Sequence, residues 1–446
     1  MRTFFIEPLV MLATVLQWLV LSTIVGALVG TGVSFFLIAL FASTDLTADI
    51  SLWLQMLLLP LGGLANGLLL YYGYRLNRTG LSDSVITAVH DQRGRMPLKT
   101  LWIKPVAGII TLASGGAAGK EGPCSHLGAN LASGLGQALK LNSELRKRLV
   151  ACGVSAGFAS VFGTPIAGAI YGVEVLAVGR IRHDFLLPAI IGGVTAHQVS
   201  LFWGVPYDNY HIPFLESFSQ LIFVKTIILG IACGLIARFY VDVVHGVRKL
   251  FEKLRSTFNI WPLLLPFIGG CLIAVLIFWI PTDYLGLSLP LMDSALEGNA
   301  IHWTGFIWKT LLVAITLGSG FYGGVVTPQF VIGAVAGNAL AIYLGINPAL
   351  GAAIGLVAVL ASASNTPIAA ILMGVELFGG TGLLYVAGAS ISAYLLIGHR
   401  SIYPDQRLAY AKSTWIHLQS ELPIGQEKVR LSYGLLKWWS QRKNRK

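Results

Sequence analysis

The chain has 446 residues, of which 55% are hydrophobic and only 11% charged, and its formal net charge is +11. Soluble domains carry about 25% charged residues, so this composition excludes an ordinary soluble protein and indicates an integral, multi-pass membrane protein. The positive charge does not indicate a nucleic-acid partner, because the basic residues flank apolar runs instead of forming one basic surface.

The first predicted element is a long apolar span near the N-terminus. No charged residue occurs between residues 9 and 44. A helix needs about 20 apolar residues to cross the hydrocarbon core, so this run predicts a long, tilted membrane helix. The run is too long for the core of a signal peptide, and only one basic residue, Arg2, precedes it, so we expect an uncleaved span.

Further apolar runs follow along the chain, and glycine or proline interrupts many of them. Transmembrane β-strands would be alternating segments of about 10 residues, whereas these runs are longer and do not alternate, so the predicted fold class is all-α. The 51 glycines suit close helix packing. The runs lie near residues 52–74, 101–118, 149–178, 184–204, 219–238, 261–281, 306–346, 349–378 and 381–398.

Basic residues cluster at the ends of several runs, at residues 75–78, 93–99, 146–148 and 437–446. By the positive-inside rule these segments, and the C-terminus, are expected in the cytoplasm of a cell (inner) membrane protein. We expect one transmembrane domain over residues 1–405, followed by a short basic tail, residues 406–446, without a regulatory domain. The four cysteines form no CxxC pair and are expected to be small buried residues.

The chain contains an internal repeat. Gly119 matches Gly324 and Lys104 matches Lys309 at an offset of 205, and residues 164–167 and 172–174 match residues 366–369 and 374–376 at an offset of 202. A fixed offset indicates a duplicated unit, with halves near 50–205 and 215–405. In transporters such halves meet at the midplane, where broken helices point their N-termini at the substrate. The two lysines are expected at helix ends with amines reaching water, or, alternatively, to act on an anion through their field.

The repeat separates three glutamates. Glu121 lies opposite Val326, so the shared scaffold does not need it, whereas Glu174 and Glu376 match each other and favour a structural role. A charge at membrane depth is normally paired or functional. Glu121 lies between glycines at a predicted helix start, where unpaired N–H groups attract anions, so its carboxylate can compete with a dissolved anion for them. The pattern indicates an anion path with a side-chain gate.

Two motifs resemble a known family. Residues 119–123 (Gly-Lys-Glu-Gly-Pro) are similar to the G(K/R)EGP signature of the ClC chloride channels and proton-coupled chloride antiporters, and residues 323–328 to the family's GGxFxP motif, with valine where phenylalanine is usual. The resemblance runs in order from about residue 60 to 410. It implies two inverted halves of tilted and broken helices, assembled as a homodimer in the lipid bilayer, with one pore per subunit.

The resemblance also implies roles for single residues. Glu121 would be the gating glutamate, which leaves an anion site on protonation or anion entry. Backbone amides near Val325 and Val326, and the glycines Gly119 and Gly122, would form the anion site. Tyr403 falls where the family places a tyrosine whose hydroxyl contacts the anion.

Two departures from the family pattern bear on function. The family's GSGIP motif corresponds to residues 79–83, where the proline is lost and the serine position falls on Thr79 or Gly80, with Thr79 or Ser82 as the hydroxyl donor. Where the antiporters commonly have an internal glutamate, this chain has Val175. The loss favours a channel or a weakly proton-coupled carrier. The alternative is a proton-coupled chloride or fluoride antiporter, with Glu121 and Glu174 as the proton path.

Other function classes lack the residues that they need. No nucleophile–base pair or metal-ligand set occurs, so no enzyme and no cofactor are expected. Residues 318–323 fit G-x-G-x-x-G but lie in an apolar helical context without the strand that a dinucleotide site requires. A scaffold without transport would have no need for a lone glutamate at a midplane helix start. The expected partners are chloride or a similar anion, protons, lipid and a second copy of the chain.

Overall fold

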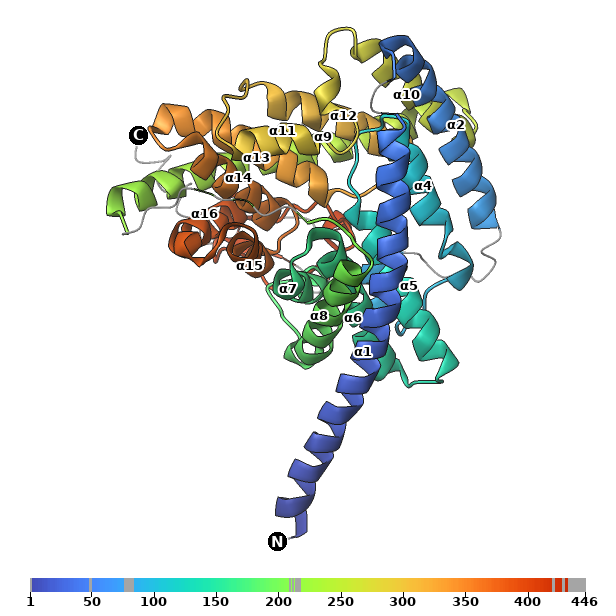
Figure 1. Ribbon diagram of the computed structural model, residues 1–446, viewed down its shortest axis with the longest axis vertical. Helices are drawn as coiled ribbons and strands as arrows, with labels where there is room; N and C mark the ends of the chain where they lie inside the picture. The colour runs from blue at the N-terminus through green and yellow to red at the C-terminus, as the bar shows by residue number, and fades with distance from the viewer. Residues whose placement is uncertain are drawn as a thin grey trace.

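The computed structural model describes residues 2–47, 50–75, 84–207, 210, 212, 218–418, 422–426 and 430–431. Helices dominate these residues (Figure 1). In the first half they are α1 (Arg2–Asp45), α2 (Leu52–Arg75), α3 (Val85–His90), α4 (Ile103–Ala113), α5 (Glu121–Ala138), α6 (Ser143–Phe162), α7 (Pro165–Glu174) and α8 (Leu186–Phe202). In the second half they are α9 (Gln220–Phe258), α10 (Leu265–Leu276), α11 (Leu289–Leu296), α12 (Gly305–Ser319), α13 (Val326–Leu344), α14 (Pro348–Ala363), α15 (Pro367–Phe378) and α16 (Leu383–Leu396).

Short elements connect the helices. Two two-residue strand pairs occur in the described part of the chain: β1 (Ala177–Val178) pairs in parallel with β2 (Arg407–Leu408), and β3 (Ile416–His417) pairs antiparallel with β4 (Arg430–Leu431). The 3₁₀ turns are η1 (Leu98–Thr100), η2 (His183–Phe185), η3 (Pro262–Leu264), η4 (Thr282–Tyr284), η5 (Gly380–Gly382) and η6 (Ile424–Gln426). The fold is mostly helical, as the sequence predicts.

Several helices present apolar surface outward, as a lipid environment requires. Helix α1 runs along one side of the molecule, and its N-terminal part projects beyond the other helices (Figure 1). Leu9 on that part is 70% exposed. Five helices in the described residues are long and apolar enough to cross a membrane, at Ile6–Asp45, Leu52–Gly73, His183–Phe202, Gln220–Phe258 and Val326–Leu344.

Three of the apolar runs that follow the first span, 149–178, 306–346 and 349–378, each form two helices, and local sequence explains the breaks. Gly163 ends α6 in the left-handed conformation at φ 71°, which glycine adopts without a Cβ clash. Pro165 then starts α7, where its missing N–H costs nothing. The same change of helix separates α12 from α13 and α14 from α15. Helix α9 continues to Phe258, well past the predicted end of its apolar run at 238.

The expectation for Lys309 is wrong. Its side chain is fully buried, and its Nζ donates to the carbonyl oxygens of Tyr284 (3.1 Å) and Gly286 (2.9 Å) and to Ser288 Oγ (2.7 Å). A buried ammonium is stable only with such acceptors. Lys309 therefore holds the connection from η4 to α11 in place instead of reaching water. Of the cysteines, Cys124, Cys152 and Cys233 are buried, as expected, whereas Cys271 is partly exposed.

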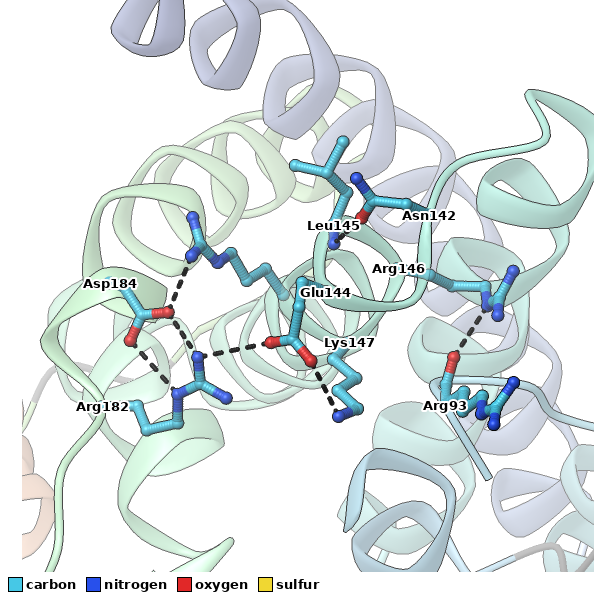
Figure 2. A network of polar contacts seen from close by, with 9 residues as sticks. Arg93, Asn142, Glu144, Leu145, Arg146, Lys147, Arg182 and Asp184 are labelled. Atoms are coloured by element: carbon cyan, nitrogen blue, oxygen red, sulfur yellow. Dashed lines mark hydrogen bonds and ion pairs between the residues drawn. The ribbon is translucent and has the colours of Figure 1, made fainter. Parts of the chain in front are cut away.

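A charged network surrounds the start of α6 (Figure 2). Asn142 caps the helix by accepting a hydrogen bond from the Leu145 N–H. Glu144 pairs with Lys147 at 2.9 Å and with Arg182 at 3.5 Å, so the start of α6 is tied to the segment before α8. The network continues through Asp184, which pairs with Arg182 and Arg148.

One pair of repeat partners joins the two halves directly. Gly119 and Gly324 are repeat partners, and they form an antiparallel bridge with each other. The Gly119 N–H donates to the Gly324 carbonyl at 2.8 Å, and the Gly324 N–H donates back at 2.7 Å. A residue that touches its own repeat partner lies at the axis relating the two halves. The predicted site is therefore at the centre of the internal symmetry.

Candidate anion site at the axis between the halves

The Glu121 side chain occupies the N-terminus of a helix in the other half. Glu121 is the first residue of α5, yet its carboxylate accepts hydrogen bonds from the start of α13: from the Val326 N–H at 2.5 Å and the Thr327 N–H at 3.1 Å. The Thr327 hydroxyl adds a third, at 2.7 Å. Glu121 is only 3% exposed, so these charge-assisted bonds replace its hydration. The carboxylate sits where a small anion would find the same donors.

Glycines leave the space for this carboxylate. A Cβ on Gly324 would lie 1.9 Å from Glu121 Oε1, and one on Gly119 would lie 2.2 Å from Oε2. A Cβ on Gly122 would lie 2.8 Å from the Gly324 Cα. No other residue type fits these three positions without moving the Glu121 carboxylate or the bridge between the halves.

The segment before α13 is held by buried side chains from other helices. The Tyr240 hydroxyl of α9 donates to the Val325 carbonyl at 3.2 Å. Asn66 of α2 accepts from the Tyr322 N–H through Oδ1 and donates to α4 through its amide nitrogen. These bonds fix the direction in which the first N–H groups of α13 point. Preorganised donors of this kind bind an anion without having to reorganise.

A cavity of about 200 Å³ leads to Glu121. Tyr171 of α7 and Tyr403 line it, and their hydroxyls are 2.7 Å apart. Lys104 of α4 also lines the cavity, is buried, and lies 5.2 Å from the centre of the Tyr322 ring. The lining of this cavity therefore combines a basic side chain and two hydroxyl groups with the Glu121 carboxylate.

The structure brings together most of the residues that the sequence singled out. Glu121, Gly122 and Tyr403 line one cavity, and the Val326 N–H donates to the Glu121 carboxylate. The Gly119 N–H is used by the bridge to Gly324, so Gly119 contributes space instead of a donor. Thr79 and Gly80, which the sequence also assigned to the anion site, lie outside the described residues.

Glu174 lies in a different environment. Its carboxylate accepts from the N–H groups of Ile368 at 3.1 Å and Ala369 at 2.8 Å, at the start of α15. Val175, which follows it, does line the cavity. The Glu174 carboxylate therefore caps α15, although the next residue in the chain lines the cavity.

Sequence reasoning did not assign Thr327 and Tyr171, which lie at the centre of the site. The signal that singled out Glu121 applies to both, because each differs from its repeat partner. Thr327 lies opposite Gly122 (327 − 205 = 122), and Tyr171 lies opposite Met373 (171 + 202 = 373). This signal is not specific, because neighbouring residues such as Gly168 also differ from their repeat partners.

Comparison with known proteins agrees with this geometry. Residues 62–398 match the family model described as "Voltage gated chloride channel". A "Chloride/fluoride channel protein" of Pseudomonas syringae pv. tomato is 35% identical over 415 residues, which cover 91% of this chain and 90% of that protein. The crystal structure of a "CLC-type fluoride/proton antiporter" superposes with a TM-score of 0.82 at 29% identity and covers 88% of this chain and 98% of that one.

A more distant structure shares the fold. The "slow cyanobacterial Cl-/H+ antiporter" superposes with a TM-score of 0.71 at 21% identity, covering 85% of this chain and 94% of that one. Together these similarities confirm the predicted fold, two inverted halves of tilted and broken helices, and the predicted family.

Proposed function

Because this chain belongs to the ClC family of multi-pass membrane proteins, which transport anions and are not enzymes, we propose that it exchanges fluoride or chloride for protons through a path gated by Glu121. The observation that carries this proposal is the seat of the Glu121 carboxylate on the Val326 and Thr327 donors. An anion and the carboxylate compete for these donors. Protonation of Glu121 removes the negative charge of its carboxylate and so weakens its binding to these donors. Anion entry and proton uptake therefore favour each other.

Fluoride is the favoured anion. The site offers an O–H group and backbone N–H groups at short distance, and a small anion gains most from donors that approach closely. Two relatives named above, one called a chloride/fluoride channel protein and one a fluoride/proton antiporter, support this choice. Chloride remains the second substrate, because the relatives' names include both ions.

A channel-like or weakly coupled path is the second candidate. It is favoured by Val175, which lines the cavity with a side chain that carries no proton. In a coupled carrier, Glu121 is the proton station, and Glu174 or water would complete the proton path. The two candidates differ in whether an anion gradient drives protons uphill.

We also propose a homodimer and a cytoplasmic C-terminus. Ile166 and Ile368, which are repeat partners at the starts of α7 and α15, are 38% and 44% exposed, which favours packing of a second copy of the chain against these helices. The basic residues around α6 support placing that end, and the C-terminus, in the cytoplasm of the cell membrane. Mass measurement in detergent and protease accessibility of the tail test these two points.

Transport in vesicles of purified protein tests the function. A fluoride or chloride gradient is imposed without a proton gradient, and anion and proton fluxes are recorded together. Uphill proton movement supports antiport. Anion flux without proton movement supports the channel. Folded protein without any anion flux overturns both.

A further inference from the structure

Tyr403 lies on a segment without helical structure that follows α16, so its position depends on side chains around it. Its hydroxyl meets Tyr171, which α7 holds, and both line the cavity that leads to Glu121. The Tyr403 N–H is bonded to Ser401 Oγ at 3.0 Å. What holds Ser401 therefore also holds this tyrosine pair, the contact between Tyr171 and Tyr403.

Gln406 holds Ser401. Its side chain is fully buried, and Oε1 accepts from Ser401 Oγ at 2.8 Å and from Asn365 Nδ2 at 3.3 Å. On the other side of the amide, Nε2 donates to the carbonyl oxygens of Val175 and Ser364, both at 3.0 Å. A primary amide has two donor hydrogens and an oxygen that accepts two bonds, so the Gln406 side chain uses its full capacity.

The two carbonyls belong to different halves of the repeat. Val175 is the C-cap of α7, the helix that carries Tyr171, and Ser364 is the C-cap of α14. Gln406 therefore ties the end of the Tyr171 helix to the second half and, through Ser401, to the backbone of Tyr403. The Gln406 N–H also bonds to the Tyr403 carbonyl at 3.2 Å.

We infer that Gln406 is a positioning residue for anion transport: it sets the distance between Tyr171 and Tyr403 and so the width of the cavity on the way to Glu121. This inference rests on the proposed function, because it assumes that the anion passes the tyrosine pair. The sequence places the domain boundary at residue 405, but the next residue, Gln406, is buried and bonded to helix ends of the transmembrane domain. The segment that follows Tyr403 thus belongs to the transport machinery, although it begins the predicted tail.

The test compares Gln406→Met with a matched control, Asn338→Leu. Asn338 is also a fully buried amide that donates to two backbone carbonyls, those of Ala295 and Asn299, but it does not touch the tyrosine segment. Both variants are expected to lower the melting temperature. Only Gln406→Met is expected to change the apparent KM for the anion, by about tenfold, which corresponds to roughly the net free energy of one hydrogen bond at the tyrosine pair.

A double-mutant cycle shows whether Gln406 acts through the tyrosine. Tyr403→Ala is expected to change the same transport parameter, and adding Gln406→Met is expected to change it no further. The inference is overturned if the fold-changes of Tyr403→Ala and Gln406→Met multiply in the double variant. It is also overturned if Asn338→Leu changes the transport kinetics as much as Gln406→Met does. Where Gln406→Met does not fold, Ser401→Ala replaces it. This variant removes the hydroxyl that links Gln406 Oε1 to the Tyr403 N–H and leaves the bonds of Gln406 to Val175 and Ser364 in place, and unchanged kinetics there overturn the inference. Loss of the proposed function would appear separately, as absence of anion flux in the unmodified protein.

Discussion

Glu174 and Glu376 each cap the helix that carries the other. Glu174, at the end of α7, accepts from the first N–H groups of α15, and Glu376, on α15, accepts from those of Ile166 (2.9 Å) and Ala167 (2.7 Å) at the start of α7. The two residues are repeat partners (376 − 174 = 202), so the exchange follows the internal symmetry. Each carboxylate satisfies donors that the helix itself leaves unpaired.

The capping pair predicts equal effects of two matched variants. Glu174→Gln and Glu376→Gln should each lower stability by about 1–2 kcal/mol, because each replaces a charged acceptor at a helix N-terminus by an amide that offers one acceptor oxygen. We expect the ratio of protons to anions to stay unchanged in both. Thermal unfolding in detergent and flux in vesicles measure the two effects. A proton flux lost in Glu174→Gln alone would place Glu174 on the proton path and contradict this prediction.

Glu121→Gln should open the anion path. The amide keeps the shape of the side chain but places an NH₂ group against the donors of α13, so the seated state loses charge-assisted bonds and its population falls at least roughly tenfold. Anion passage should persist, while its pH dependence and any proton movement disappear. Anion flux and proton flux are measured with ion-selective electrodes in vesicle suspensions over a range of pH. A pH response equal to that of the unmodified protein would remove Glu121 from the mechanism.

Gly324→Ala should displace the gate without changing its charge. The new Cβ would lie 1.9 Å from Glu121 Oε1, so the carboxylate cannot keep its seat. We expect faster anion passage that depends less on pH, together with some loss of stability. Gly246→Ala in α9 is the control, since a Cβ there meets nothing within 4 Å. Unchanged anion passage and pH dependence in a folded Gly324→Ala protein would show that the carboxylate does not block the anion path from this position.

Thr327→Val should lower affinity for fluoride more than for chloride. Valine keeps the size of the side chain and the backbone N–H but removes the O–H donor to the anion seat. A hydrogen bond to a charged group contributes about 1.5–3 kcal/mol, so the loss should be roughly tenfold or more. Thr310→Val is the control, because its hydroxyl bonds only to the Phe306 carbonyl one turn earlier. The measurement is the apparent KM for fluoride and for chloride, obtained from flux in vesicles of each variant. An equal change for both anions would contradict a specific role for the hydroxyl.

The sequence by itself determined the membrane class, the helical fold, the family and the importance of Glu121. These follow from local quantities: apolar runs of membrane length, the fixed offset of the repeat, and a glutamate where the other half has Val326. The break of three long runs into helix pairs could be read from residues such as Gly163 and Pro165, because glycine and proline act on the backbone at their own positions.

Only the tertiary structure decided which donors each of these side chains meets. Sequence places Glu121 at the start of α5, but its carboxylate binds the start of α13, 205 positions later in the chain. Lys309 is buried against carbonyls of a preceding connection, and Gln406 joins two helix ends far apart in sequence. A hydrogen bond depends on distances of about 3 Å between groups that folding brings together. Periodicity and composition record which residues are apolar or charged, and they carry no information on those distances.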